Sequence, residues 1–406
     1  MILTATPLSG FDGLFDPAAA AAMPRHVHAA LLGSALAADQ RLHLAFPGAT
    51  DLVYPDLAAI LTHQQLVNVG DPFEAGHGRN NTKSYEIAII RQLGALAGGD
   101  RGQVWGYVTT GSSEGTLHAV DDAVRAYPDA VIFASTAAHY SVAKAANMVR
   151  APLVLVRADI QGRMMLDDLR QRLTEFQDRP ICIVATAGTT EHEAVDDIAG
   201  IATLCQDLGI TRLRLHVDAA LAFLPLLLLP EHDRPDIGFR AGATSIVVSG
   251  HKFLSTLMPC AVLIYPQRPA SHPADPVSYI GASDTTITGS RSGHTPLLLH
   301  WALTSFSLQQ HQARATAARE LAAYTHDRLA RMSWPHQWKH PGFTIRLAQP
   351  TQPLPRPWVL GGDHTTGRII TMPGIEQAQI DEFTTDLAAA HGRRIPRQRR
   401  TPRAAS

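Results

Sequence analysis

Seven short apolar segments between residues 104 and 265 constrain the fold more than any other feature of the sequence. They are VWGYVT (104–109), VIFA (131–134), LVLVR (153–157), ICIVAT (181–186), LRLHV (213–217), SIVV (245–248) and AVLIY (261–265). Stretches typical of helices lie between most of them, at 114–126, 138–149, 166–176 and 197–208. Continuous apolar strands that alternate with helices predict an α/β fold: a mostly parallel seven-stranded sheet with helices on both faces.

The length of 406 residues predicts more than one lobe, because a single core stops growing at about 250–300 residues. We expect an Ala-rich N-terminal segment (1–65, with a helix at 24–40) and a large domain (66–294). A long helix with a break and a smaller C-terminal α+β lobe should follow (295–392). That lobe should contain strands in FTIRLA and GRIITMP and a helix at 377–391. The Arg-rich end, 393–406, is expected to be a solvated tail, and a specific anionic contact is the alternative.

Composition excludes several classes of protein. The formal net charge of −1 argues against electrostatic binding of nucleic acid or an anionic membrane surface. No apolar run reaches the roughly 18 residues of a spanning helix, and the N-terminus lacks the pattern of a secretory signal. The three cysteines (Cys182, Cys205 and Cys260) lie far apart in apolar contexts, which predicts reduced, buried thiols in a cytoplasmic protein without a zinc site.

Ligands of parallel sheets bind at the carboxyl ends of the strands, so candidate site residues are those that follow each strand. The first strand leads into Gly111-Ser112-Ser113 and an apolar helix. Free backbone N–H groups, two hydroxyls and the positive end of a helix dipole suit a phosphate. The segment matches neither a Walker motif nor GxGxxG. The alternative is an ordinary helix start capped by Ser113.

Three further strand ends carry polar groups. His139 follows the second strand, where a structural histidine is the alternative to a ligand contact. Thr186 and Thr189 lie at the end of ICIVAT and could bind a ligand or only form a turn. Asp218 directly follows LRLHV, among apolar residues. A buried carboxylate is costly unless it meets a cation, so a functional role is favoured for Asp218.

Lys252 lies in Ser249-Gly250-His251-Lys252, between two apolar strands. Only four of the 35 basic residues are lysines, so a lysine in this setting needs a reason. A buried lysine has a depressed pKa and can act as a nucleophile, typically one that forms a Schiff base; a snorkelling or ion-paired lysine is the alternative. A phosphate site, an imidazole, a buried aspartate and a buried lysine are together the parts that pyridoxal 5'-phosphate requires.

With these residues in order, the chain resembles the group II pyridoxal-phosphate-dependent amino-acid decarboxylases, especially bacterial histidine decarboxylases and plant serine decarboxylases. The resemblance covers roughly residues 68–301 and extends into 372–383. It rests on NVGDPF (68–73), TTGSSEG (109–115), HYSVAKAA (139–146), ATAGTT (185–190), VDD (195–197), HVDAA (216–220), SGHKFL (249–254), PCAVLIY (259–265), GASDTTITGSRSGHTPLLLHW (281–301) and MPGIEQAQIDEF (372–383). It implies fold type I and a homodimer with its active site at the subunit interface.

The resemblance also implies roles for individual residues. Lys252 would bond to the cofactor aldehyde, Asp218 would pair with the pyridinium nitrogen, and His139 would stack on the ring. The phosphate would be surrounded by Ser112, Ser113, Ser249 and His251, and Thr186 would approach the ring hydroxyl. Tyr54 falls where the family lines its substrate pocket. Residues 279–290, without helical or strand periodicity, would form a mobile lid over the partner's site and bring Tyr279 near the substrate Cα.

The reaction implied is decarboxylation of an L-amino acid to an amine and CO₂, with histidine as the default substrate. A small aliphatic or hydroxy amino acid, such as valine or serine, is the alternative within the same chemistry. Transamination, aldol cleavage and a non-enzymatic role as an interaction subunit are rival hypotheses. The sequence departs from the family at Ala187 and at Glu191-His192-Glu193, close to the ligand end of the sheet.

Overall fold

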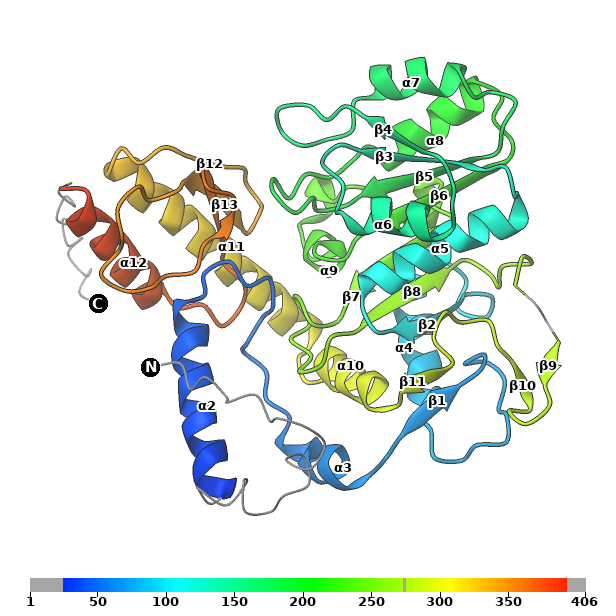
Figure 1. Ribbon diagram of the computed structural model, residues 1–406, viewed down its shortest axis with the longest axis horizontal. Coiled ribbons are helices and arrows are strands. Elements are labelled where there is room, and N and C mark those ends of the chain that lie inside the picture. Colours follow the sequence, from blue (N-terminus) through cyan, green and yellow to red (C-terminus); the bar gives the residue numbers. More distant parts are fainter. Residues whose placement is uncertain (1–24, 273–274, 393–406) are drawn as a thin grey trace, which may run out of the picture.

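The computed structural model describes residues 25–272 and 275–392, and its centre is a seven-stranded sheet (Figure 1). All seven predicted strands are confirmed within one or two residues at each end. They are β2 (Trp105–Thr109), β3 (Val131–Ser135), β4 (Leu153–Val156), β5 (Ile181–Thr186), β6 (Leu213–Asp218), β7 (Ser245–Ser249) and β8 (Ala261–Tyr265).

The strand order is β2-β8-β7-β6-β5-β3-β4. Strand β8 pairs antiparallel with both of its neighbours, β2 and β7, and every other pairing is parallel. The predicted mostly parallel sheet is therefore confirmed. Six strands point their carboxyl ends to the same edge, and β8 begins there.

Helices cover both faces of the sheet, as predicted. Ile132 and Ala134 of β3 pack with α5 and α6, whereas Val131 and Phe133 point into the cluster that holds α7 and α8. This alternation follows from the period of two along a strand. The helices of this domain are α4 (Lys83–Leu96), α5 (Ser112–Ala126), α6 (Ser141–Met148), α7 (Leu166–Thr174), α8 (Ile198–Asp207) and the short α9 (Phe223–Leu227).

The predicted long helix is two helices, α10 (His294–Thr304) and α11 (Leu308–Arg331). The break lies where Ser307 caps α11: its side chain accepts from the backbone of Gln310, and the Gln310 side chain accepts from the backbone of Ser307. Figure 1 shows α11 leading away from the sheet into the second lobe.

The C-terminal lobe has its own four-stranded antiparallel sheet, in the order β12-β13-β15-β14, and a second apolar core. The predicted strands and helix are present as β13 (Thr344–Ala348), β15 (Thr366–Ile370) and α12 (Gln377–Ala390). Strands β12 (His336–Trp338) and β14 (Gly361–Gly362) are too short to show a period in the sequence. Leu44, from the N-terminal segment, packs into this core with Ile345 and Phe383.

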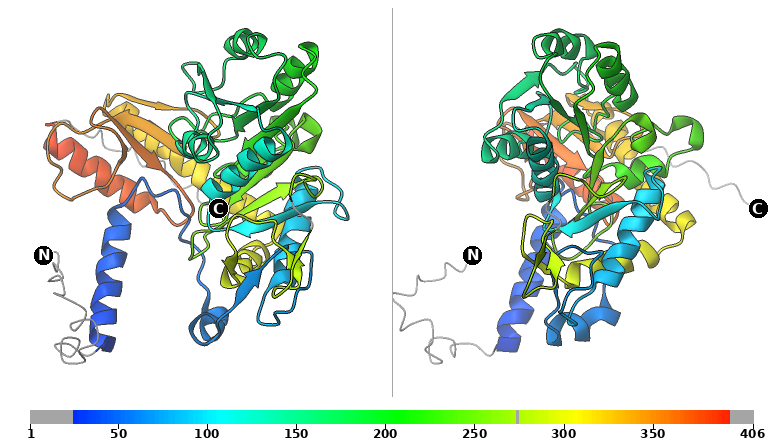
Figure 2. Two further views of the ribbon diagram at one scale, coloured as in Figure 1. Left: turned by 45° about the vertical axis from the view of Figure 1, so that its right-hand side comes forward. Right: turned by 90° about the vertical axis from the view of Figure 1, so that its right-hand side faces the viewer.

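The predicted N-terminal helix is α2 (Arg25–Leu42), and it stands away from the large domain in Figure 1 and in the left view of Figure 2. Its Leu31, Leu32 and Leu36 side chains are all more than half exposed. Near its C-terminal end, Arg41 pairs with Glu382 of α12. A short helix, α3 (Ala58–His63), follows before the chain enters the large domain.

The segment after β8 contradicts one expectation, because it contains regular structure. It forms β9 (Pro276–Val277), β10 (Ala282–Ser283) and β11 (Ser290–Ser292), and β11 pairs with β1 (Val67–Val69). Glu74 accepts hydrogen bonds from the backbone and side chain of Ser283 at 2.7 and 3.0 Å. Glu74 and Ser283 are 209 residues apart in the sequence, so no local pattern in the sequence predicts their contact.

The remaining expectations concern the thiols and the chain ends. All three cysteines are free and buried, as predicted. Among the described residues, no helix combines the length and the apolar character needed to cross a lipid bilayer. The predicted Arg-rich tail, 393–406, lies outside the described residues.

A buried ion pair joins β11 to the core of the large domain. The Arg291 guanidinium lies 3.1 Å from both carboxylate oxygens of Glu86, and both side chains are almost fully buried. Glu86 also accepts from the Val108 backbone N–H at 2.7 Å, and Arg291 donates to the Gly70 carbonyl at 2.9 Å. The pair therefore ties β11, α4, β2 and the turn after β1 together.

We predict that Arg291→Ala lowers the free energy of unfolding by about 3–5 kcal/mol, because it leaves the Glu86 carboxylate buried without a cation. Thermal unfolding of the purified protein measures the effect. Arg163→Ala is the matched control, since the Arg163–Asp159 pair is solvent-exposed and worth at most about 1 kcal/mol. Equal losses in the two variants would contradict the prediction.

Candidate active site

The carboxyl edge of the sheet gathers the residues that the sequence singled out. Ser249 ends β7, Asp218 ends β6 and Thr186 ends β5, and these three strands are neighbours. Thr186 and Asp218 lie directly opposite each other in the register of β5 and β6. His139 follows β3, the next strand in the sheet. The predicted positions therefore lie side by side.

Asp218 is the buried charge at the centre of this edge, with 6% of its surface exposed. One carboxylate oxygen accepts from the Ala220 N–H at 3.1 Å. Burial lowers the pKa of both His139 and Lys252, and the charge of Asp218 opposes the shift in each. The pKa of Lys252 stays below its usual value, and the positive charge of Arg368 lowers it further.

Lys252 is presented by a tight turn between β7 and β8. A side chain at Gly250 would meet the Cys260 sulfur at 2.6 Å, so this position requires glycine. The Lys252 carbonyl accepts from the Ala49 N–H at 2.9 Å. Ser255 Oγ donates to the Ala49 carbonyl at 2.7 Å. Ala49 of the N-terminal segment therefore stabilises the backbone of the turn that carries Lys252.

Tyr54 belongs to the same support. It is 5% exposed, and its hydroxyl donates to the Ser255 carbonyl at 3.1 Å. The hydroxyl is therefore engaged with the turn that follows Lys252. The predicted contact between Tyr54 and the substrate stays a prediction.

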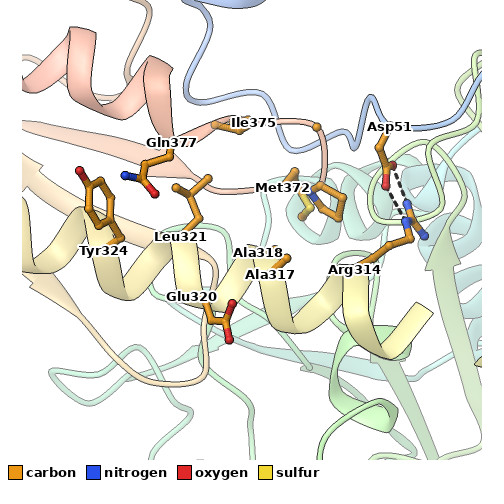
Figure 3. Close-up of a pocket in the computed structure, with 12 residues that line it drawn as sticks. Asp51, Arg314, Ala317, Ala318, Glu320, Leu321, Tyr324, Met372, Ile375 and Gln377 are labelled. Atoms are coloured by element: carbon orange, nitrogen blue, oxygen red, sulfur yellow. Dashed lines mark hydrogen bonds and ion pairs between the residues drawn. The ribbon is translucent and has the colours of Figure 1, made fainter. Parts of the chain in front are cut away.

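A second support of the lysine turn appears in Figure 3, at one end of a cavity of about 540 Å³ between α11 and residues 372–377. Arg314 binds both carboxylate oxygens of Asp51, at 2.6 and 2.7 Å. The same guanidinium donates to the Phe253 carbonyl at 3.1 Å. None of the predicted site residues lines this cavity.

The N-terminus of α5 is the predicted phosphate position. Ser112 Oγ lies 2.7 Å from Ser249 Oγ, so hydroxyls from two separate strand ends meet there. The N-cap of α5 is Gly111 and no side chain caps the helix, so the alternative of a Ser113 cap is wrong. Ser113 is exposed in the first turn. Uncapped N–H groups and adjacent hydroxyls fit a phosphate group.

His251 and Thr186 complete the surroundings. His251 is half-buried, its Nδ1 lies 3.0 Å from the Cys260 carbonyl, and burial lowers the pKa of its imidazole. Thr186 Oγ1 is buried and has no hydrogen-bond partner within the described residues. A buried hydroxyl without a partner is costly, so its place beside Asp218 fits a polar group on a bound cofactor.

His139 is half-buried, and its Nδ1 lies 2.8 Å from Ser141 Oγ. Burial lowers the pKa of the imidazole below its usual 6.5; Lys252 lowers it further, and Asp218 opposes the shift. The ring is therefore neutral at pH 7, which suits stacking on an aromatic cofactor.

Tyr279 is the predicted site residue that the structure does not place beside the others. Its side chain is 82% exposed. It lines a cavity of about 340 Å³ whose other walls come from residues 67–83 and 280–290. None of the strand-end residues lines that cavity, so its predicted role over the site of a partner stays a prediction.

Arg368 is the residue that strand-end reasoning missed. It projects from β15 of the C-terminal lobe, donates to the Thr190 carbonyl at 3.2 Å and pairs with Glu191. Its charge reaches Lys252. The one signal in the sequence is an arginine inside the apolar strand GRIITMP.

Comparisons with known proteins show the family of the chain. The family model described as the pyridoxal-dependent decarboxylase conserved domain matches residues 116–332. Histidine decarboxylase from Mesorhizobium japonicum is 34% identical over 85% of this chain and 92% of its own length. Serine decarboxylase 2 from Oryza sativa is 35% identical over 64% of this chain and 56% of its own.

The chain belongs to the pyridoxal-dependent decarboxylase family. It is a carboxy-lyase of the group II type that uses pyridoxal phosphate to decarboxylate an amino acid. L-methionine decarboxylase from Streptomyces sp. 590 has the same fold, with a TM-score of 0.79, 22% identity, and coverage of 90% of this chain and 95% of that one. Fold type I and the smaller C-terminal lobe are confirmed.

We predict that the acidic limb of the pH profile of kcat/KM contains a step below pH 6.5 that belongs to His139. Its lowered pKa keeps the ring neutral until the pH falls below the usual value, and protonation then places a cation beside the bound ring. His139→Asn should remove that step. Titration of the substrate itself changes the pH profile of wild type and His139→Asn equally. The measurement is therefore the difference between the two kcat/KM profiles. Identical acidic limbs would contradict the assignment.

Proposed function

We propose that this decarboxylase acts on L-histidine, releasing CO₂ and histamine, and that it works as a cytoplasmic homodimer. The observation that carries the chemistry is a half-buried Lys252 at the carboxyl edge of the sheet, whose pKa is lowered by burial, a shift that the charge of the buried Asp218 opposes. Histidine decarboxylases recur among the relatives, with 34% and 31% identity for those of Mesorhizobium japonicum and Pseudomonas entomophila. The three buried, free cysteines support a reducing compartment.

Each residue of the site has a proposed part in binding the cofactor. Lys252 supplies the amine that holds its aldehyde, and Asp218 holds a proton on the ring nitrogen. His139 packs on the ring, and Thr186 Oγ1 binds the ring hydroxyl. The phosphate is bound at the N-terminus of α5 by the following groups: Ser112, Ser113, Ser249 and His251. Pyridoxal phosphate, when bound, supplies the electron sink for the carbon that loses CO₂.

An amino-acid substrate also needs a cation for its carboxylate. Arg368 is the guanidinium whose charge reaches Lys252, and its Nε is buried without a partner within the described residues. We therefore assign the substrate carboxylate to Arg368. The carboxylate end then contacts the C-terminal lobe, while the amine end contacts Lys252 on the large domain.

Two exposed features support the homodimer. An isolated helix of 18 residues gains little stability in water, yet α2 exposes Leu31, Leu32 and Leu36. Tyr279 is exposed, and the cavity that it lines holds none of the strand-end residues of its own chain, as expected if it serves the site of a second copy. The Tyr279 hydroxyl would then protonate Cα after CO₂ has left.

Serine is the second candidate substrate, because rice serine decarboxylases match this chain at 35% and 29% identity. The two substrates make different demands on the site. Histidine needs room for an imidazole beyond Cα, whereas serine needs a hydrogen-bond partner close to it.

The test is a screen of all common L-amino acids with the purified, pyridoxal-phosphate-loaded protein, in which CO₂, amine and keto acid are measured together. We expect CO₂ and histamine from histidine in equal amounts. Serine turnover to ethanolamine would support the second candidate. Keto acid without CO₂ would overturn the decarboxylase assignment for this chain.

Lys252→Ala should abolish turnover and prevent borohydride from fixing the cofactor to the protein, because the amine that bonds to it is gone. Mass spectrometry of the reduced protein locates the adduct. Lys144→Ala is the matched control, since Lys144 is exposed on α6. An adduct on Lys83, Lys144 or Lys339 would contradict the assignment.

Asp218→Asn should keep the fold and lose roughly a hundred- to several-thousand-fold in kcat. An amide cannot hold the ring proton by charge, and a buried ion pair is worth about 3–5 kcal/mol, at about 1.4 kcal/mol per decade of rate. Steady-state kinetics and circular dichroism measure the two effects. A rate within about threefold of the wild type would show that another group holds that proton.

A further inference from the structure

The tripeptide Glu191-His192-Glu193, which sets this chain apart in the sequence, lies between the two lobes. It follows β5, and each of its side chains contacts the small sheet. Glu191 pairs with Arg368 of β15. His192 Nε2 lies 3.2 Å from Arg346 Nη1 of β13. Glu193 accepts from the N–H groups of Phe343 and Thr344 at 2.7 and 2.9 Å.

The two arginines create an electrostatic problem. Arg346 and Arg368 are direct cross-strand neighbours in the register of β13 and β15. Like charges placed directly opposite each other repel. Within the described residues, Glu191 is the one acid that forms an ion pair with either of them. His192 adds no positive charge near neutral pH, because burial and then Arg346 lower its pKa.

The two glutamates act on different targets. Glu193 accepts from backbone N–H groups of the small lobe, and its own backbone has a φ of +52°, which is uncommon outside glycine. It therefore ties the lobes together without touching Arg368. Glu191 binds the guanidinium itself and is 43% exposed, so changing it should disturb the core little.

Arg368 is held along one side only. Its Nη1 serves both the Thr190 carbonyl and Glu191. A Cβ at Gly361 would lie 2.9 Å from Nη2, so the absence of a side chain there gives the guanidinium its room. Its Nε has no hydrogen-bond partner within the described residues, although a guanidinium has five N–H donors.

We propose that Glu191 is a positioning residue that holds the Arg368 guanidinium in place for the carboxylate of the amino-acid substrate. This inference rests on the proposed function. Without the Glu191 charge, Arg346 repels Arg368 and the long side chain leaves its position. Binding of ligands with a free carboxylate weakens, whereas binding of ligands that lack one does not change.

The experiment compares L-histidine, L-histidine methyl ester and histamine on the loaded wild type, Glu191→Gln and Glu193→Gln. Dissociation constants come from the change in visible cofactor absorbance on mixing, and KM and kcat come from CO₂ release. For Glu191→Gln we expect the dissociation constant and KM of L-histidine to rise about tenfold, with kcat within about threefold. Ester and histamine affinities should stay within about twofold. If the screen selects another amino acid, its own ester and amine replace these probes.

Glu193→Gln is the matched control: it should lower the melting temperature and weaken all three ligands by the same factor or not at all. The inference is overturned if Glu191→Gln leaves L-histidine affinity unchanged, or weakens ester and amine as much as the amino acid. A wild type that binds the probes but releases no CO₂ from any amino acid would instead overturn the proposed function. The absorbance titrations would still test Glu191 in that case.

Discussion

The architecture of this decarboxylase depends on keeping one carboxylate, that of Asp218, buried at the end of a central strand. A buried carboxylate is costly without a cation or a protonated nitrogen nearby. Lys252 meets part of that need, and in return Asp218 opposes the loss of the lysine's proton on burial. The backbone around the lysine is accordingly fixed from outside the sheet, by Ala49 and by the Arg314–Asp51 pair. The N-terminal segment is thus part of the site although it contributes no strand to the large sheet.

The seven strands of the large sheet could be predicted because burial on both faces makes each of them continuously apolar. That signal is local and needs no knowledge of partners. Strands β1 and β11 carry no such signal, since Val67 finds its partner Ser292 more than 200 residues away and each strand has three residues. The local pattern of 279–290 therefore predicts no regular structure, although β10 and the first residue of β11 lie in it.

Some residues of the candidate site could likewise be predicted from local sequence, and others could not. Residues at strand ends, such as Asp218 and Thr186, could be found because the parallel topology alone brings them to one edge. Arg368 and its contact with Glu191 could not, because they exist only after the second lobe packs against the loop that follows β5. Tyr54 has a contact that position alone did not predict, because its hydroxyl donates to the turn after Lys252.

If the substrate amine contacts Lys252 and its carboxylate contacts Arg368, the substrate spans the two lobes. The angle between the two lobes would then determine how the substrate lies in the site. A rotation of the small lobe would then move the carboxylate relative to Lys252, so it would change the position of the substrate as well as its affinity. The contacts between the lobes then help to position the substrate, and one of them, Glu191–Arg368, acts on the residue proposed to bind its carboxylate. Glu193 binds the start of β13, and Arg319 of α11 donates to carbonyls on both sides, those of Pro225 and Pro341. These hydrogen bonds join the two lobes on both sides of the loop after β5, and so they fix where Arg368 stands relative to Lys252 in the proposed complex.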